Sequence, residues 1–339
     1  METTMEHQIL YLSKQDLIEL GGAHSDPYVA AVSRALELHS AGDYVQPLKP
    51  YLRAAGENGH IADRIIAMPA YVGGETAISG LKWIGSKHDN PAKRNKERAS
   101  ALIILNDPET NYPVAVMEGS LISSMRTAAV TVIGARHLAK EGFEAVSVIG
   151  CGLIAKMQII SLLEQFGTIK TVRLFDLNPE AAGRLAEEIQ LRYVHIEVIV
   201  EETSEQAVRQ AEVLVTATVA SAPHIPYEWL AKGTFVSNIS IMDLHKDVFI
   251  QADKVIVDDW DQSNREKKII NQLVLEGKFS REQLHAELGE ILIGRKPGRE
   301  SDDEIIVLNP MGMAVEDIAS AAELYRRALS AGKGTVLWL

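Results

Sequence analysis

The segment Gly150–Ala155, which reads Gly-Cys-Gly-Leu-Ile-Ala, constrains the fold more than any other part of the sequence. The apolar run 145–149 comes directly before it and predicts a buried strand, and a helical pattern over 153–166 follows it. A second predicted strand, 171–175, then ends at Asp176. Strand, glycine turn, helix and strand in this order predict a βαβ unit with a right-handed crossover.

The spacing and residue types of this unit are those of a dinucleotide-binding fingerprint. Asp176 lies 21 residues beyond Ala155 (176 − 155), as the fingerprint requires. Gly150 permits a tight turn, Gly152 allows a pyrophosphate to approach the backbone, and Ala155 keeps the helix close to the sheet. The helix N-terminus supplies N–H donors and a positive potential for the phosphates. We therefore expect a bound dinucleotide; a tight turn without a ligand is the alternative.

Asp176 also predicts which dinucleotide binds. A carboxylate at the end of the second strand accepts hydrogen bonds from both ribose hydroxyls and repels a 2′-phosphate, which favours NAD over NADP. Arg173 is close in sequence, but strand alternation makes it a weaker candidate for a phosphate clamp. Cys151 stands at a variable position of the motif, and we interpret it as a small packing residue rather than a nucleophile.

The remaining patterns divide the chain into two kinds of structure. Strands and helices alternate from 145 to 257, which predicts a doubly wound, mainly parallel sheet. Residues 44–118 instead hold short β-like runs separated by Gly, Pro and Asn turns, which predicts an antiparallel sheet. Long helical patterns cover 119–141 and 311–330. Ser13-Lys14-Gln15-Asp16 predicts a capped helix start near the N-terminus.

Length and composition exclude several classes of protein. The 339 residues suggest about two domains, because one hydrophobic core stops growing near roughly 250–300 residues. A net charge of −12 disfavours a nucleic-acid binder. The single cysteine excludes an intrachain disulfide. The sequence holds no apolar run near the ~20 residues of a membrane span and no apolar signal core, so we expect a cytoplasmic protein without a membrane partner.

The charge is unevenly distributed. Residues 46–98 hold nine basic and five acidic groups, a balance of +4, which leaves −16 for the rest of the chain. A basic segment on an acidic protein can steer a small anion into a cleft. A solvated basic loop is the alternative.

Three charged residues stand out from their surroundings. Lys82 interrupts an apolar strand-like run, so it should face a ligand or a carboxylate unless it is an edge-strand lysine that reaches solvent. Arg126 interrupts an apolar helix, where a structural salt bridge is the alternative to substrate binding. Asp243 follows the predicted strand 234–239, at the sheet edge where α/β proteins build active sites. Asp243 and His245 alone do not make a metal site, and we expect no metal.

With these residues assembled, the chain resembles the ornithine cyclodeaminase/mu-crystallin family. The resemblance runs from Met68-Pro69 to the segment 312–317. Its most specific parts are Lys82 followed by Asn90-Pro91, the helix segment Arg126–Ala129, and the strand Asn238–Asp243. It implies a Rossmann doubly wound domain plus an α+β substrate and dimerisation domain built from both chain ends.

The resemblance also implies domain limits and a site. The expected parts are a substrate domain (1–125), an NAD-binding domain (126–312) and a C-terminal helix that returns to the substrate domain (313–339). Catalytic roles fall on Lys82 and Asp243. The expected substrate-binding residues are Arg53, Lys49, Arg64 and Arg126, where either Lys49 or Arg53 corresponds to the family's first basic residue. The expected cofactor-binding residues are Thr127, Gly150, Gly152, Leu153, Ile154, Ala155, Asp176, Thr218, Asn238, Met311 and Gly312.

Three segments, 58–64, 83–95 and 309–313, resemble one branch of the family more closely. Enzymes of that branch oxidise the glutamate-side C–N unit of a secondary amine with NAD, and water splits the imine into 2-oxoglutarate and L-2,3-diaminopropionate for siderophore or antibiotic synthesis. The resemblance therefore implies a small anionic amino-acid substrate and a homodimer.

Other activities in the family stay open. The family's Gly-Gly-Asp is Ile241-Met242-Asp243 here, which weakens ornithine cyclisation. The alternatives are ornithine cyclodeaminase, alanine dehydrogenase or ketimine reductase, and a non-catalytic mu-crystallin-like binder of small ligands. Retention of Asp243 together with Lys82 and Arg126 argues against a pure binder.

Overall fold

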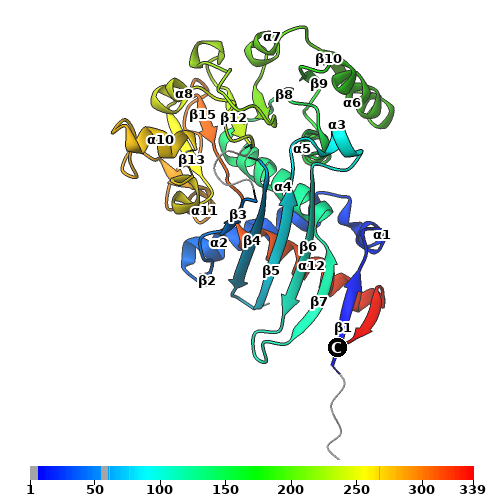
Figure 1. Cartoon of the computed structure of the whole chain (residues 1–339). Helices are drawn as coiled ribbons and strands as arrows, with labels where there is room; N and C mark the ends of the chain where they lie inside the picture. The colour runs from blue at the N-terminus through cyan, green and yellow to red at the C-terminus, as the bar shows by residue number, and fades with distance from the viewer. Residues whose placement is uncertain (1–6, 55–59, 61, 76, 267) are drawn as a thin grey trace, which may run out of the picture. The chain divides into compact units, whose positions relative to one another are not determined.

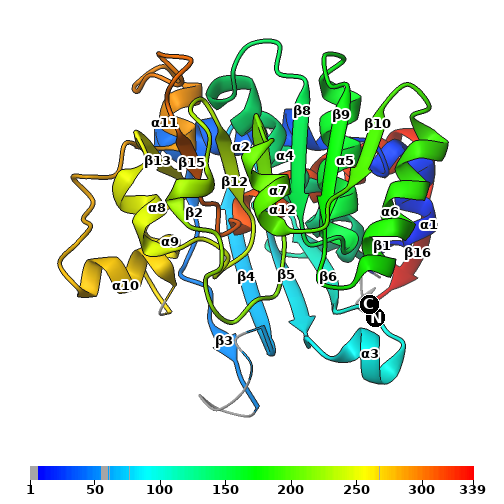
Figure 2. The same ribbon diagram turned by 90° about the horizontal axis from the view of Figure 1, so that it is seen from above.

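The computed structural model describes residues 7–54, 60, 62–75, 77–266 and 268–339. The chain divides into two compact units (Figures 1 and 2). Unit 1 consists of Met1–Arg126 and Met313–Leu339, and unit 2 is Thr127–Gly312. Helix α4 (Ser120–Leu138) runs from the one into the other. Among the described residues, no helix is long and apolar enough to cross a membrane.

Unit 1 is built on a mixed eight-stranded sheet. The antiparallel pairing predicted within 44–118 is confirmed for β4 to β7, and β5 lies between β4 and β6. Both chain ends extend this sheet, because β1 pairs parallel with β7 and β16 pairs antiparallel with β1. The strands are β1 (Gln8–Leu12), β2 (Tyr44–Val45), β3 (Tyr51–Leu52), β4 (Arg64–Val72), β5 (Ile78–Ser86), β6 (Ala99–Asn106), β7 (Pro113–Glu118) and β16 (Thr335–Trp338).

The long helix α12 covers one face of the unit 1 sheet. Helix α12 packs on β4, β5 and β6 and on α2, and Figure 1 shows it behind these strands. The predicted cap at Ser13 is confirmed, but α1 has only four residues, since a π-helical turn with Gly21 at φ 86° follows it. The helical elements are α1 (Lys14–Leu17), η1 (Ile18–Gly22), α2 (Asp26–Ala41), α3 (Asn90–Arg94) and α12 (Ala314–Ala331).

Unit 2 has the predicted doubly wound parallel sheet. Its strand order is β10-β9-β8-β11-β12-β15-β13-β14, and all of its pairs are parallel. Strand β15 was not predicted, because its three residues are too short for a periodic signal. The strands are β8 (Ala145–Ile149), β9 (Thr171–Phe175), β10 (Glu197–Val200), β11 (Val213–Thr216), β12 (Phe235–Asn238), β13 (Lys254–Val257), β14 (Ala286–Glu287) and β15 (Ile306–Leu308).

The core of unit 2 explains its apolar strand sequences. Strands β11, β12, β13 and β15 are buried along their whole length, as expected for parallel strands covered on both faces. The other helical elements are α5 (Leu153–Gln165), α6 (Pro179–Arg192), α7 (Ser204–Arg209), η3 (Tyr227–Trp229), α8 (Lys246–Gln251), α9 (Trp260–Ser263), α10 (Ile269–Leu275) and α11 (Leu288–Leu292).

Candidate active site residues in each unit

Lys82 is buried in unit 1 against a carboxylate. Its side chain is 1% exposed, and its Nζ lies 2.6 Å from Asp317 Oδ2. The ammonium group also donates a hydrogen bond to Ser123 Oγ at 3.1 Å. Because β5 is an interior strand, the edge-strand alternative for Lys82 is wrong. Of the two predicted partners for Lys82, a ligand or a carboxylate, the structure shows the carboxylate.

Arg126 joins the same group of charges. Its Nε donates to Asp317 Oδ1 at 2.8 Å, and its NH1 nitrogen donates to Glu316 Oε2 at 2.8 Å. Both acids stand in the first turn of α12 and are fully buried. The structural salt bridge that was the alternative to substrate binding for Arg126 is therefore present. We call Lys82, Arg126, Glu316 and Asp317 the buried charge cluster.

The environment of Lys82 shifts its acidity. Burial lowers the pKa of Lys82 to about 7; Asp317 opposes this shift, and the positive charges of Arg126 and Lys49 add to it. Lys49 is itself buried, and it lies close enough for its charge to act on Lys82. An ammonium group with a pKa near neutrality can bind a carboxylate when protonated and can also exchange its proton.

Arg53 and Arg64 belong to a different contact. Their guanidinium carbons lie 5.4 and 4.7 Å from the centre of the Tyr51 ring, within the range of cation–π interactions. The structure thus groups Lys49, rather than Arg53, with Lys82. Of the other basic residues in 46–98, Lys93 and Arg94 pair with Asp89 on α3.

The glycine turn of unit 2 has the geometry that the motif predicts. Gly150 has φ 90°, and a Cβ atom there would lie 3.0 Å from the backbone of Ala217. A Cβ atom on Gly152 would meet nothing within 4 Å, so the space beside the start of α5 is open. Ala155 is buried, as required for close packing of α5 on the sheet. This open cradle at a helix N-terminus fits a pyrophosphate.

Asp176 closes the other side of this turn. Its Oδ2 accepts from the Cys151 N–H at 2.7 Å, and its Oδ1 accepts from the Asn178 N–H at 2.8 Å. Burial raises the pKa of Cys151 to about 12, which fits a packing residue better than a nucleophile. Arg173 pairs with Glu201 of unit 2 and is therefore already engaged by a carboxylate.

Asp243 is fully buried in unit 2 and is held by Thr218. The Thr218 hydroxyl donates to Asp243 Oδ1, and the Thr218 N–H donates to Oδ2 at 3.3 Å. The carboxylate is thus oriented by neutral donors. The structure brings together two predicted residues that are 25 positions apart.

Asn238, Met311 and Gly312 lie in hydrogen-bond networks that the sequence did not reveal. The Asn238 amide donates to Asn309 Oδ1 at 2.6 Å. The N–H groups of Met311 and Gly312 both donate to Asp258 Oδ2, at 2.9 and 2.6 Å. Asn309 and Asp258 therefore position predicted cofactor residues. Leu153 and Ile154 open α5, and Thr127 is half-buried on α4.

A group of three potential metal ligands was not predicted. His60 and His88 stack with ring centres 4.1 Å apart, and Asp63 Oδ1 lies 2.8 Å from His88 Nδ1. These residues come from two of the segments that resemble the diaminopropionate-forming branch; residues 58, 59 and 61 of the first lie outside the described part. Lys87 Nζ contacts Asp63 Oδ2 at 3.0 Å, so a bound cation would have to compete with this ammonium group.

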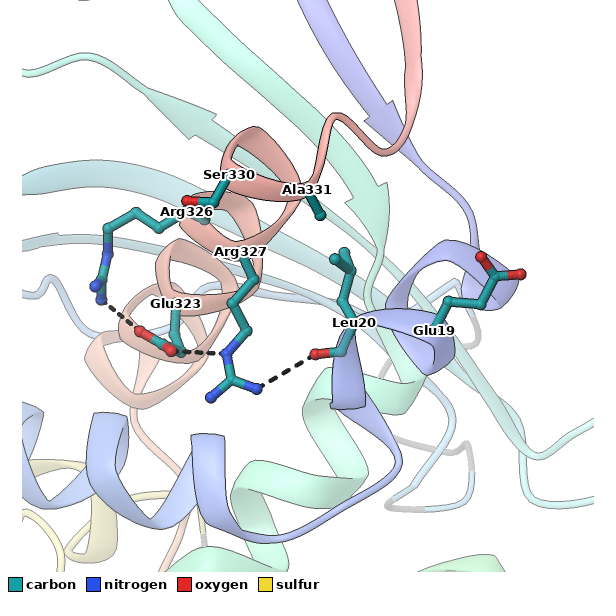
Figure 3. Close-up of a pocket in the computed structure, with 7 residues that line it drawn as sticks. All are labelled: Glu19, Leu20, Glu323, Arg326, Arg327, Ser330 and Ala331. Atoms are coloured by element: carbon teal, nitrogen blue, oxygen red, sulfur yellow. Dashed lines mark hydrogen bonds and ion pairs between the residues drawn. The ribbon is translucent and has the colours of Figure 1, made fainter.

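A pocket of 520 Å³ in unit 1 contains none of the predicted site residues (Figure 3). Arg326 and Arg327 both contact the carboxylate of Glu323, and Arg327 also donates to the Leu20 carbonyl oxygen at 3.3 Å. The charges of Arg326, Arg327 and Glu323 are thus paired with one another within the pocket. The lining residues are Glu19, Leu20, Glu323, Arg326, Arg327, Ser330 and Ala331.

A parallel sheet with an open glycine turn, next in sequence to a unit that buries basic residues against acids, is the architecture of a two-unit dinucleotide-binding protein. The chain belongs to the ornithine cyclodeaminase/mu-crystallin family, whose sequence profile matches residues 20–332. It is 62% identical over 333 residues to the N-((2S)-2-amino-2-carboxyethyl)-L-glutamate dehydrogenase of Staphylococcus aureus, and the match covers 98% of this chain and 99% of the relative.

Solved structures show the same fold. A Thermococcus litoralis Δ1-pyrroline-2-carboxylate reductase in complex with NADH and L-proline matches with a TM-score of 0.89 and 30% identity, over 96% of this chain and 99% of that one. An archaeal alanine dehydrogenase dimer with bound NAD matches with a TM-score of 0.86 and 32% identity, over 98% and 99%. The predicted fold class and family are confirmed.

Proposed function

We propose that the chain is an NAD-dependent dehydrogenase of N-((2S)-2-amino-2-carboxyethyl)-L-glutamate. The observation that carries this proposal is the 62% identity to the Staphylococcus aureus enzyme across nearly the whole of both chains. The reaction oxidises the secondary amine to an imine, and water then splits the imine into 2-oxoglutarate and L-2,3-diaminopropionate. The second product would serve siderophore or antibiotic synthesis.

Unit 2 supplies the residues that bind NAD. The open space at Gly152 and the N–H groups at the start of α5 suit the pyrophosphate, and Asp176 suits the ribose hydroxyls. Thr127, Thr218, Asn238, Met311 and Gly312 complete the set that the family implies. When bound, NAD accepts a hydride from the α-carbon on the glutamate side of the substrate.

Unit 1 supplies the residues that bind the substrate carboxylates. The substrate has three carboxylates, and Lys49, Lys82 and Arg126 provide three buried or nearly buried cations. Arginine can pair with a carboxylate through two parallel hydrogen bonds. The Arg53 and Arg64 pair on Tyr51 is the next basic group along the same segment and suits a second carboxylate.

Asp243 carries the proton transfers. It takes the proton of the secondary amine as the C–N bond becomes an imine, and it then helps to activate the water that attacks the imine carbon. The two hydrogen bonds from Thr218 orient the carboxylate for this work. Lys82 fixes a carboxylate and polarises the C–N unit.

A homodimer fits the outer face of the unit 1 sheet. Trp83 is 42% exposed and Leu102 is 50% exposed, and the two residues are paired neighbours on β5 and β6. Their side chains point away from the face that carries Lys82, because side chains alternate along a strand. Apolar residues gathered on an open sheet face are typical of a surface that another chain covers. We assign dimerisation to this face and the reaction to the cytoplasm.

The test supplies purified protein with NAD and the secondary amine, and follows NADH absorbance and both products. We expect NADH, 2-oxoglutarate and L-2,3-diaminopropionate in equal amounts. Turnover of ornithine to proline and ammonia, with no NADH from the secondary amine, would refute the proposal in favour of a cyclodeaminase. Oxidation of alanine, or reduction of a cyclic imine, as the sole activity would indicate the other enzymes of the family. Binding without turnover would indicate a mu-crystallin-like protein.

A further inference from the structure

We propose that Asp317 and Glu316 are positioning residues: they fix the separation of Lys82 and Arg126, and Asp317 keeps Lys82 in the ammonium form that binds a substrate carboxylate. This inference rests on the proposed function and adds two acidic residues to the substrate-binding group of unit 1, whose other proposed members are all basic.

The contacts of Asp317 set the distance between the two cations. One carboxylate oxygen, Oδ2, lies 2.6 Å from Lys82 Nζ, and the other, Oδ1, accepts from Arg126 Nε at 2.8 Å. The two cations stand on β5 and α4, and the acid stands on α12. A single carboxylate therefore connects three elements that are far apart in the sequence. The separation of the cations follows from the width of that carboxylate.

Glu316 fixes the orientation of the guanidinium group. Its Oε2 accepts from the NH1 nitrogen of Arg126 at 2.8 Å and from the Met313 N–H at 3.1 Å. The second contact is part of the cap of α12, so the Glu316 side chain is tied to its own helix. With Nε held by Asp317 and NH1 held by Glu316, the plane of the Arg126 guanidinium group is determined.

Charges of both signs gather around Lys82. Asp317 contacts Lys82 from α12, and the charges of Arg126 on α4 and of Lys49 in the segment before β3 also act on it. Glu316 on α12 joins the group through its ion pair with Arg126. Counting Lys82 itself, three cations meet two carboxylates, a balance of +1. Without the acids, three buried cations would repel each other and favour the loss of a proton from a lysine.

Asp317 is the acid that raises the pKa of Lys82. Burial and the charges of Arg126 and Lys49 lower the pKa of Lys82, and Asp317 is the group that opposes them. A variant that removes the charge of Asp317 will therefore hold Lys82 neutral at pH 7. A neutral amine does not attract a carboxylate, so the substrate will bind more weakly while NAD binding in unit 2 is unchanged.

The experiment compares Asp317→Asn with Glu316→Gln, two near-isosteric changes. KM for the secondary amine is measured from pH 5.5 to 8.5, and NAD affinity is measured separately by fluorescence titration. For Asp317→Asn we expect the pH at which KM begins to rise to move down by at least about one unit, so that KM at pH 7 increases about tenfold or more. For Glu316→Gln we expect weaker catalysis with no displacement of this pH limb.

The two proposals fail in different ways. If the wild type makes no NADH from the secondary amine, the proposed function is wrong, and the same comparison is made with the amino acid that the wild type does oxidise. If Asp317→Asn binds NAD normally and keeps the wild-type pH limb, the positioning role of Asp317 is wrong.

A double variant covers the case in which Asp317→Asn does not fold, since removal of one partner leaves a buried charge unpaired. Lys82→Met with Asp317→Asn removes both charges of the pair. We expect it to bind the product 2-oxoglutarate more weakly than Lys82→Met alone, because Arg126 loses its contact with Asp317. Measured by calorimetry, the loss should be by the same factor from pH 5.5 to 8.5, since the ion pair with Lys82 is absent from both variants. Equal binding by the two variants would show that Asp317 does not position Arg126, and a loss that grows with pH would show that Asp317 acts on the pH limb through a group other than Lys82; either result would overturn the inference.

Discussion

Each unit buries an aspartate completely, but the two acids have different partners. Asp317 in unit 1 contacts two cations, Lys82 and Arg126. Asp243 in unit 2 accepts hydrogen bonds from the hydroxyl and the N–H of Thr218. The charge of the first acid is balanced by cations, whereas the side-chain oxygens of the second accept from a neutral hydroxyl and a neutral amide.

This difference separates an acid that holds other groups in place from an acid that can take a proton. An ion-paired buried carboxylate resists protonation, because a proton would break the pair. A carboxylate oriented by a hydroxyl and an amide can accept a proton from a bound amine without leaving a cation unpaired. We therefore assign the chemistry to Asp243 and the positioning to Asp317.

The largest expected effect tests this assignment directly. Asp243→Asn keeps the shape of the side chain but removes the base, so turnover should fall by about 10²–10⁴-fold, the typical contribution of general acid–base catalysis. NAD binding, measured by fluorescence titration, should stay within about twofold. Unchanged turnover would remove the proposed role, and equal pH profiles for Asp243→Asn and Asp317→Asn would erase the distinction between the two acids.

The second prediction concerns the backbone of the glycine turn at Gly150, which the proposed NAD site of unit 2 requires. Gly150→Ala places a Cβ atom 3.0 Å from the backbone of Ala217 at φ 90°, which should cost roughly 1–3 kcal/mol of stability and weaken NAD binding. Gly183→Ala on α6 is the matched control, since a Cβ atom there meets nothing within 4 Å. It should be neutral or stabilise by up to about 1 kcal/mol. Urea unfolding and NAD titration measure both.

The sequence predicts the site residues of unit 2 better than those of unit 1, because the first set depends on local spacing and the second on long-range contacts. The NAD half depends on local features: a strand, two glycines, a helix start and an acid 21 residues beyond Ala155 (176 − 155). These lie within one βαβ unit, so spacing alone places Gly150, Gly152 and Asp176. The strand β8, which precedes the turn, and the strand β9, which follows the helix, have the predicted bounds.

The charge cluster of unit 1 depends on contacts that no local pattern contains. Arg126 and Glu316 are 190 positions apart, and the sequence does not state which buried acid faces which buried base. A signal was nevertheless present, because Glu316 and Asp317 interrupt an apolar helical pattern as Arg126 does. Isolated charges on apolar faces need partners, so the interruptions could have been paired with each other.

The third prediction tests whether Asp176 chooses the cofactor. Asp176→Ser removes the carboxylate that would repel a 2′-phosphate, and it also loses one of the two oxygens that now accept from the backbone. We expect the ratio of kcat/KM for NAD to that for NADP to fall about tenfold, as removal of one modest repulsion allows. Glu180→Gln, a charge removal at an exposed position on α6, is the control and should leave the ratio unchanged.

The last prediction concerns stability and compares one buried lysine in each unit. The pKa of Lys82 is about 7 in the folded chain, against the ordinary lysine value of 10.5 that applies to the unfolded chain. Between these two values the unfolded chain therefore binds one more proton than the folded chain. The free energy of unfolding should rise with pH across this window, by about 1.4 kcal/mol per pH unit from this residue. Lys82→Met should remove that rise.

Lys254 in unit 2 provides the opposite case. Burial alone would lower the pKa of Lys254, but hydrogen bonds to Glu300 and Glu304 raise it above its ordinary value. Folded and unfolded chains then hold the same proton from about pH 7 to 9, so Lys254→Met should change the unfolding free energy equally at every pH in that range. Urea unfolding at pH 7, 8 and 9 distinguishes the two lysines. A pH-independent loss in Lys82→Met as well would show that the ammonium group of Lys82 stays charged, and the charge cluster would then hold two full ion pairs at every working pH.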